Sequence, residues 1–329
     1  MYAVLMRSKT GSSPRPGGRI GRIRFAHNYE DIISVENLLE AWREFVRGKR
    51  KKLDVQEFQH ALMDNIFALH HAIYRMLYPF FDRAFIADSY SCRRGKGTHK
   101  AMDRFRRFAY TVSRNHTRTC WVLKCDIRKF FASIDQSILL DILRRSIADE
   151  RILALLSEII GSFCSCSPHR HRFTTTVGNR CQHRGLPLGN LTSQLLVNIY
   201  MNEFDQFVKH RLKAKHYVRY ADDFVFLSAS RSDLDILLPK IAEFLERRLA
   251  LTLHPDKVFI KTLASGVDFL GWVHFPDHRV LRTATKRRMM SATARSESKP
   301  VLESYSGLLS HGNARKLARP ILTKLKSLK

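Results

Sequence analysis

The segment Tyr217–Leu227 reads YVRYADDFVFL and places two adjacent acidic residues between two runs of strand-forming residues. β-Branched and aromatic residues favour strands, and aspartate is a favoured turn residue. We therefore expect two short strands joined by a tight turn at Asp222 and Asp223. Two acids at a turn are common in proteins without any catalytic role. Whether these two are catalytic depends on which other residues lie next to them in the fold.

A third acid, Asp126, lies near the end of the apolar segment Trp121–Ile127 (WVLKCDI), which predicts a buried strand. If this strand end meets the hairpin, three carboxylates gather and raise each other's pKa unless cations neutralise them. Oxygen ligands of this kind suit Mg²⁺. Two such ions about 4 Å apart can activate a primer 3′-hydroxyl and stabilise departing pyrophosphate. We expect Asp126, Asp222 and Asp223 to be catalytic and to hold two Mg²⁺ ions, which Mn²⁺ can replace.

The net charge indicates a polyanionic partner. The 329 residues include 57 Lys and Arg against 30 Asp and Glu, a formal net charge of +27. Such an excess repels itself in the compact state, and nucleic acid is the commonest ligand that offsets it. A ribosomal-type binder or a membrane-surface protein would also be basic, but these basic residues are spread along the whole chain instead of along one amphipathic helix.

The composition predicts a cytoplasmic protein with a large core. Hydrophobic residues make up 44% of the chain, and no apolar run approaches the roughly 20 residues of a membrane span. The first residues lack a secretory h-region, so we expect the six cysteines to be reduced thiols.

Five motifs, in order, resemble those of reverse transcriptases and together cover roughly residues 60 to 275. Tyr220–Asp223 (YADD) resembles the YxDD signature, and Asp126–Phe131 (DIRKFF) resembles the first catalytic motif. Ser89–Gly97 (SYSCRRGKG) is similar to the basic fingers loop, and Lys257 falls where the family has a lysine near the incoming triphosphate. The primer-grip motif is resembled by Phe269, Leu270, Gly271 and Trp272.

The resemblance implies a role for each position. Asp126 and Asp222 would bridge both metals, the Ile127 carbonyl would add a ligand, and Asp223 would complete the cluster. Phe131 would be a steric gate whose ring excludes the ribose 2′-hydroxyl, so that dNTPs are selected. Lys257 would contact the triphosphate or act as a general acid. Phe131 as a core aromatic and Lys257 as an ordinary lysine remain alternatives.

The stretch Leu188–Gln194 (LGNLTSQ) indicates a subgroup. Most reverse transcriptases have Gln before Gly189 and Pro after the serine, where this chain has Leu188 and Gln194. The pattern resembles reverse transcriptases of diversity-generating retroelements, which implies error-prone copying and a small accessory protein that forms a helical barrel. Leucine offers shape but no hydrogen bond near the nascent base pair, and discrimination by shape is modest. Alternatively, Leu188 simply packs.

One departure concerns the fingers. The family has a basic strand hairpin between two helices, but here Ala68-Leu69-His70 runs directly into His71-Ala72-Ile73 with no room for it. Either Arg93, Arg94 and Lys96 hold the incoming triphosphate instead, or the enzyme is weakened or inactive.

The order of strand, helices, hairpin, helix and strand predicts an α+β fold. We expect a right-hand polymerase palm with an antiparallel sheet and flanking helices, reduced helical fingers and a short helical thumb. The expected ranges are a flexible leader at 1–30, fingers at 31–120, palm at 121–275 with an insertion at 164–184, and a basic thumb at 276–329. Further strand-like pieces are Leu251–Leu253 and Phe269–Phe275.

The insertion contains cysteines and histidines that could supply zinc ligands, although their spacing matches no common zinc module; they are Cys164, Cys166, His169, His171, Cys181 and His183. A basic loop near the template is the alternative.

Three hypotheses follow. The leading one is an RNA-directed DNA polymerase of the diversity-generating type that uses an RNA template, a primer and dNTPs. The second is a group II intron or retron polymerase. The third is a degenerate polymerase retained as an RNA-binding protein.

Overall fold

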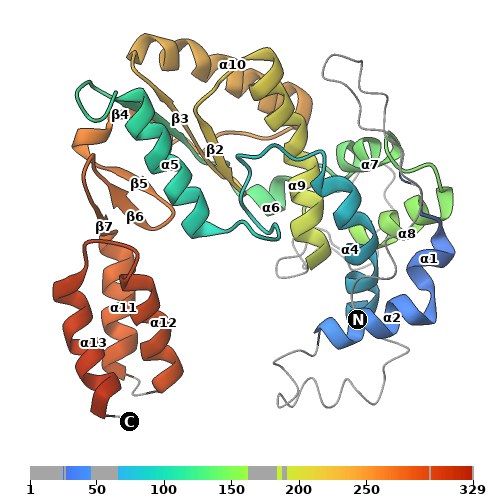
Figure 1. The fold of residues 1–329 in the computed structure, drawn as a ribbon. Coiled ribbons are helices and arrows are strands. Elements are labelled where there is room, and N and C mark those ends of the chain that lie inside the picture. Colours follow the sequence, from blue (N-terminus) through green and yellow to red (C-terminus); the bar gives the residue numbers. More distant parts are fainter. Residues whose placement is uncertain are drawn as a thin grey trace, which may run out of the picture.

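The computed structural model describes residues 25, 27–45, 66–161, 184–186, 191–295 and 298–327. Figure 1 shows three regions: a central palm built on a sheet, a group of helices carrying the amino-terminal residues on one side, and a bundle of carboxy-terminal helices on the other. Sheet and helices share one mixed α+β architecture, as predicted from the sequence. Within the described residues, no helix is both long and apolar enough to cross a membrane.

The palm sheet has four antiparallel strands in the order β2-β3-β1-β4. They are β1 (Trp121–Cys125), β2 (Tyr217–Tyr220), β3 (Asp223–Ser228) and β4 (Phe259–Thr262). Strand β1 is central: Cys125 pairs with Phe224 of β3, and Lys124 pairs with Phe259 of β4. Three segments far apart in the chain therefore meet in one sheet.

Helices cover both faces of this sheet. On one face α5 (Thr98–Val112) packs Phe105 and Phe108 against Val122, Val218 and Val225. On the other face α9 (Leu191–Gln206) and α10 (Arg231–Leu249) belong to the main core. Alternate strand residues point to opposite faces, so residues 122 and 124 of β1 lie on the α5 side.

The remaining helices of this part extend the main core. Helix α4 (Ile66–Asp82) is one uninterrupted helix through His70 and His71, as the sequence predicts. The others are α1 (Tyr29–Ile33), α2 (Val35–Phe45), α6 (Phe130–Ser133), α7 (Gln136–Arg144) and α8 (Glu150–Gly161), and a π-helical segment (Phe207–Arg211) follows α9.

The thumb begins on a second antiparallel sheet, which consists of β5 (Val267–Phe269), β6 (Trp272–His274) and β7 (Arg279–Leu281). Helices α11 (Thr283–Arg295), α12 (Lys299–Leu309) and α13 (Arg315–Ser327) follow. Their buried core joins Trp272 of the sheet to Met289 and Leu302 of the helices and to Met102 of α5. The expected boundary after residue 275 therefore falls inside a sheet.

Three expectations need correction. Leu251–Leu253 is not a strand; Leu253 forms only an isolated bridge with Ile127, and β4 starts at Phe259. The expected strand Phe269–Phe275 is a hairpin, because Leu270 and Gly271 turn the chain. Order begins before residue 30: Phe25 is buried, its N–H donates to the Ser146 carbonyl, and its ring meets Phe80 edge-on at 5.3 Å.

Candidate active site

Asp222 lies in a two-residue turn, and Asp223 follows it as the first residue of β3. Tyr220 pairs with Asp223 across β2 and β3, so Ala221 and Asp222 form the turn. Ala221 has φ +55°, in the left-handed region that residues with a Cβ rarely adopt. The backbone at Ala221 is therefore strained. Strained backbone conformations are typical of functional sites.

Asp126 reaches the same place from β1. The last pair between β1 and β3 joins Cys125 to Phe224, so Asp126 lies one residue further along, next to Asp223. Beyond it, the Asp126 carbonyl accepts a 2.8 Å hydrogen bond from the N–H of His254, and the N–H of Arg128 donates to Thr252. This ladder does not use the Ile127 carbonyl, whose predicted role as a metal ligand remains a prediction.

Two lysines accompany the aspartates. Lys257 Nζ lies 3.1 Å from Asp126 Oδ1, and the Lys257 side chain is exposed. Lys124 Nζ lies 3.6 Å from Asp223 Oδ2, and its side chain is only 9% exposed. Sequence reasoning missed Lys124; the available signal was a lysine two residues before Asp126 in an apolar strand, which puts both side chains on one face.

Burial and mutual repulsion disfavour charge on the hairpin acids. Burial, with added repulsion from Asp126 and Asp222, raises the pKa of Asp223 to about 7 despite the attraction of Lys124. Burial also raises the pKa of Asp222, and the charge of Asp126 raises it further. Asp223 Oδ1 is buried without a hydrogen-bond partner among the described residues. These are the conditions that a cation relieves.

The three aspartates suit a divalent cation chemically, because they offer carboxylate oxygens at one end of the sheet, where β1 ends and β3 begins. Among the described residues, no three His, Cys, Asp or Glu side chains already surround a metal-sized space. Lys124 and Lys257 instead hold two of the carboxylates. A cation would therefore take the place of ammonium groups that lie there now.

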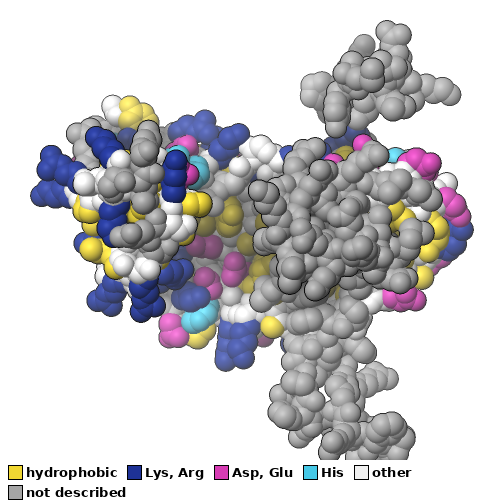
Figure 2. Space-filling view, turned by 90° about the horizontal axis from the view of Figure 1, so that it is seen from below, with side chains coloured by type: hydrophobic (Ala, Val, Ile, Leu, Met, Phe, Trp, Pro, Cys, Tyr) yellow, Lys and Arg dark blue, Asp and Glu magenta, His cyan; other side chains and the backbone are white. Residues whose placement is uncertain are grey.

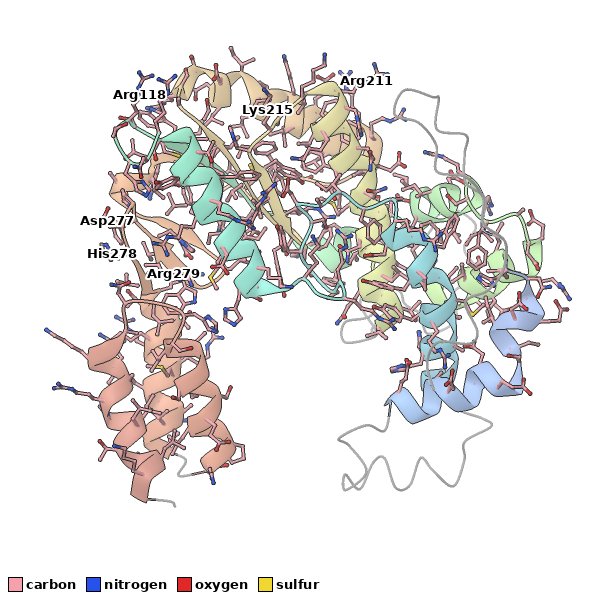
Figure 3. The ribbon with its side chains drawn as sticks, viewed as in Figure 1. Arg118, Arg211, Lys215, Asp277, His278 and Arg279 are labelled. Atoms are coloured by element: carbon pink, nitrogen blue, oxygen red, sulfur yellow. The ribbon has the colours of Figure 1, made fainter. Side chains whose placement is uncertain are left out.

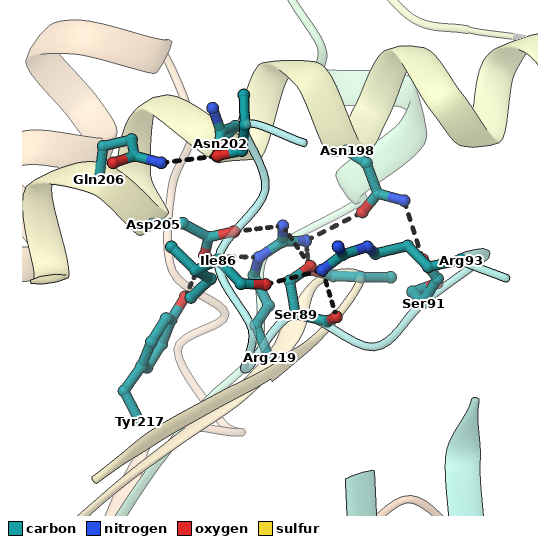
Figure 4. A network of polar contacts seen from close by, with 12 residues as sticks. Ile86, Ser89, Ser91, Arg93, Asn198, Asn202, Asp205, Gln206, Tyr217 and Arg219 are labelled. Atoms are coloured by element: carbon teal, nitrogen blue, oxygen red, sulfur yellow. Dashed lines mark hydrogen bonds and ion pairs between the residues drawn. The ribbon is translucent and has the colours of Figure 1, made fainter. Parts of the chain in front are cut away.

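Behind the turn, on the opposite face of the sheet, lies a fully buried ion pair (Figure 4). Arg219 of β2 donates to both carboxylate oxygens of Asp205 on α9, at 2.8 and 2.6 Å, and both side chains are 0% exposed. Arg219 also donates to the Ala221 carbonyl at 3.1 Å and to Ser89 Oγ at 3.0 Å. Tyr217 donates to Asp205 at 2.8 Å. This network ties the Ala221–Asp222 turn to α9 and to the loop after α4.

The predicted nucleotide-binding residues fall into two groups. Phe131 is half-buried on α6, edge-on to Phe130 at 5.5 Å, and its carbonyl accepts from Leu186 N at 2.9 Å. Leu186 thus lies beside the expected gate, whereas Leu188 and Gly189 lie outside the described residues, as does the insertion at 164–184 except for Arg184. Gln194 lies half-buried in the first turn of α9.

The basic fingers loop has a structural function that the sequence did not reveal. Arg93 donates to Asp82 at 2.7 Å and to the carbonyls of Ile86 and Ser89, so its guanidinium is engaged in holding the loop. Lys96 Nζ donates to the Ala87 carbonyl. Arg94 is exposed with its guanidinium over the Tyr78 ring at 5.5 Å. Of the three, Arg94 is the exposed one, and its contact with phosphates remains a prediction.

The predicted primer grip is the β5–β6 hairpin. Phe269 pairs with Trp272, and Leu270 and Gly271 form the turn with φ +54° and +83°. Positive φ at both residues is the conformation of a type I′ turn. Phe269 and Trp272 are buried, so the turn residues are the accessible part of this motif. Figure 2 shows acidic side chains within a hollow beside the thumb, whose surface is rich in basic side chains.

Comparison with known proteins identifies the family of this chain. The family model described as reverse transcriptase (RNA-dependent DNA polymerase) matches residues 62–274. Protein YkfC of Escherichia coli (strain K12) is 26% identical over 298 residues, which cover 80% of this chain and 72% of that protein. Group II intron-encoded protein LtrA of Lactococcus lactis subsp. cremoris is 22% identical over 282 residues, which cover 67% of this chain and 44% of that protein.

Solved structures show the same fold. The telomerase from Candida albicans, in complex with a TWJ fragment of telomeric RNA, has a TM-score of 0.51 at 13% identity and covers 85% of this chain and 50% of its own. The apo telomerase from Candida tropicalis has a TM-score of 0.52 at 12% identity, covering 86% and 53%. The chain thus spans about half the length of these telomerases.

The palm sheet and its acidic strand ends define a polymerase of the right-hand class. The chain belongs to the reverse transcriptase (RNA-dependent DNA polymerase) family.

Proposed function

We propose that this chain copies RNA into DNA by transferring deoxynucleotides to a primer 3′-hydroxyl. The observation that carries the proposal is the convergence of Asp126, Asp222 and Asp223 on one sheet edge. Two divalent cations, Mg²⁺ or Mn²⁺, would stabilise the attacking and leaving oxygens there. Asp126 and Asp222, with the Ile127 carbonyl, would hold the ions, and Asp223 would complete the cluster.

Neighbouring residues would orient the substrates. Lys257 is exposed beside Asp126, so its ammonium can leave the carboxylate for a triphosphate oxygen. Phe131 would exclude the 2′-hydroxyl of a ribonucleotide. Leu270 and Gly271, at the tip of the β5–β6 hairpin, would support the primer end. Arg94 would add a phosphate contact from the fingers.

The test is primer extension on an RNA template with Mg²⁺ and dNTPs, comparing the wild type with Asp222→Ala. Asp235→Ala is a matched control, because Asp235 is an exposed aspartate on α10. We expect extension by the wild type and the control and a loss of about a hundred- to a thousandfold in Asp222→Ala. RNA binding by all three proteins with extension by none would instead support a degenerate polymerase that only binds RNA.

The subgroup is a separate proposal. Leu188 and Gln194 in place of Gln and Pro support a diversity-generating type with error-prone copying. The similarity to group II intron-encoded protein LtrA supports the intron type instead. Sequencing extension products opposite template adenines distinguishes them: frequent substitutions at adenines favour the first, and uniform fidelity at all four template bases favours the second.

A further inference from the structure

A cavity of about 350 Å³ lies where α5, the β6–β7 turn and the α12–α13 turn meet. It is separate from the aspartate cluster and none of the predicted site residues lines it. Figure 3 shows Asp277, His278 and Arg279 together on the flank of the molecule, on the side of α5 away from the fingers helices. The cavity therefore joins the palm to the thumb on the side remote from the fingers.

Two arginines face this cavity from different elements. Arg106 comes from α5 and is exposed, and Arg279 comes from β7 and is largely buried. Burial lowers the pKa of Arg279, and the nearby charge of Arg106 lowers it further, while Asp103 raises it. Two guanidinium groups that line one open cavity are stabilised by an anion that binds both.

The hydrogen-bonding capacity of Arg279 is not used up. Its Nε donates to the His311 carbonyl. Its Nη1 is buried without a hydrogen-bond partner among the described residues and lies 3.8 Å from the Asp103 carboxylate, beyond hydrogen-bonding distance. A guanidinium has five N–H donors in a planar fork that matches phosphate oxygens. A phosphate group is thus the anion that this pair of side chains would bind best.

An aromatic platform lies in the same lining. The His278 ring stacks on Phe275 with centroids 4.8 Å apart and planes 10° from parallel. The Phe275 ring packs closely against Gly266, because an added Cβ at Gly266 would come within 2.8 Å of the ring. His278 is exposed, so its ring is accessible to a ligand. Nucleic-acid bases stack on such surfaces regardless of sequence.

We propose that this cavity binds a nucleoside phosphate, with its phosphate between Arg106 and Arg279 and its base on His278. The ligand is either a free nucleotide or one nucleotide of an RNA strand. Because Arg106 belongs to the palm and Asn313 and His311 of the lining belong to the thumb, occupation would fix the thumb relative to the palm. The site is independent of the nucleotide that enters the catalytic centre.

The experiment measures binding of 5′-AMP, inorganic phosphate and a single-stranded RNA oligonucleotide to the full chain by calorimetry. EDTA is present throughout, so that metal-dependent binding at the aspartates does not contribute. The variants are Arg106→Gln and, as matched control, Arg107→Gln, the adjacent exposed arginine of α5 that does not line the cavity. Arg279→Lys keeps the buried charge and removes the fork.

We expect Arg106→Gln and Arg279→Lys to weaken AMP binding at least tenfold and Arg107→Gln to leave it within about twofold. Loss of RNA binding in the same pattern, without measurable AMP binding, would assign the site to a strand instead of a free nucleotide. Phosphate binding as tightly as AMP would overturn the role of His278. Equal effects of Arg106→Gln and Arg107→Gln on every ligand, or no binding at all, would overturn the site.

Discussion

Asp223 is a half-buried carboxyl group whose pKa, about 7, lies well above the ordinary 3.8 because of desolvation and its acidic neighbours. Between about pH 4 and 7 the folded protein keeps a proton that the unfolded chain has lost. Stability therefore falls as the pH rises through this window, and the loss is complete above pH 7. A cation bound to the ionised carboxylate offsets that cost.

We accordingly expect Mg²⁺ to raise the melting temperature more at pH 8 than at pH 5. The same scans on Asp223→Asn, which cannot ionise, should show a much smaller difference between the two pH values. Thermal unfolding in Mg²⁺ and in EDTA measures both. An equal Mg²⁺ effect at pH 5 and pH 8 in the wild type would contradict this account of the site.

The left-handed conformation of Ala221 gives a second prediction at this scale. A β-branched residue at φ +55° is severely strained, so Ala221→Val should destabilise the protein by about 1–2 kcal/mol and distort the positions of Asp222 and Asp223. Ala221→Gly should be close to neutral, because glycine adopts positive φ without strain but loses more entropy on folding. Urea denaturation compares the two; similar stability of both variants would contradict the prediction.

The roles of some site residues could be predicted from the sequence, and those of others could not. The three aspartates were recognisable because each follows or interrupts strand-forming residues. Lys124 was missed and the structural role of Arg93 was not predicted, because each depends on a partner in another segment: Asp223 for the first and Asp82 for the second. A side chain's charge is visible in the sequence, but the atom that neutralises it is not.

At the scale of elements, the Arg219–Asp205 pair joins β2 to α9 without any exposure to water. Removing one partner of a buried pair leaves the other uncompensated, at about 3–5 kcal/mol. Asp205→Asn should therefore destabilise the protein strongly and reduce extension, since Arg219 also holds the Ala221 carbonyl.

Asp141→Asn is the matched control for this pair. Asp141 and Arg144 form an ion pair on α7 with side chains 63% and 57% exposed, and such pairs contribute about 0–1 kcal/mol. Chemical denaturation gives both values. A cost for Asp205→Asn no greater than that for Asp141→Asn would mean that the buried pair does not support the turn.

The junction between the second sheet and the thumb helices allows a paired glycine test. An added Cβ at Gly312 would lie 2.0 Å from Cζ3 of Trp272, whereas one at Gly307 in α12 would meet nothing within 4 Å. Gly312→Ala should therefore destabilise the thumb by about 1–3 kcal/mol through overpacking. Gly307→Ala should stabilise it by about 0.5–1 kcal/mol, because alanine favours the helix. Melting temperatures that move in the same direction would contradict the packing of Trp272.

Elements with strong local signals were predicted best. Strand β1 and the β2–β3 hairpin stood out through apolar and aromatic residues that are buried in the fold. Strand β4 was missed because it is an edge strand whose residues are only partly buried, so its sequence lacks an apolar pattern. The β5–β6 turn was missed because Leu270 adopts a positive φ. Leucine rarely adopts this conformation, so its presence in a sequence does not predict a turn.

For the whole molecule, a net charge of +27 predicts binding that depends strongly on salt. Contacts with about six phosphates of a single strand would give a slope near −4 in a plot of log affinity against log salt. Replacing both Lys286 and Arg287, exposed on α11, by glutamate should make this slope shallower by at least about 1. Lys240→Glu on α10 is the control. Fluorescence anisotropy with labelled RNA measures the slopes, and identical slopes would exclude α11 from the interface.

Strand β1 lies between β3 and β4, which follow it in the sequence by about 100 and about 140 residues. During synthesis from the amino terminus, this apolar strand therefore leaves the ribosome with both edges unpaired. The edges stay unpaired until β3 and β4 have been synthesised. Unpaired apolar edges are sites of intermolecular association. A nascent chain halted before residue 262 should consequently bind chaperones and aggregate. The palm sheet should fold cooperatively, and only after β4 has been synthesised.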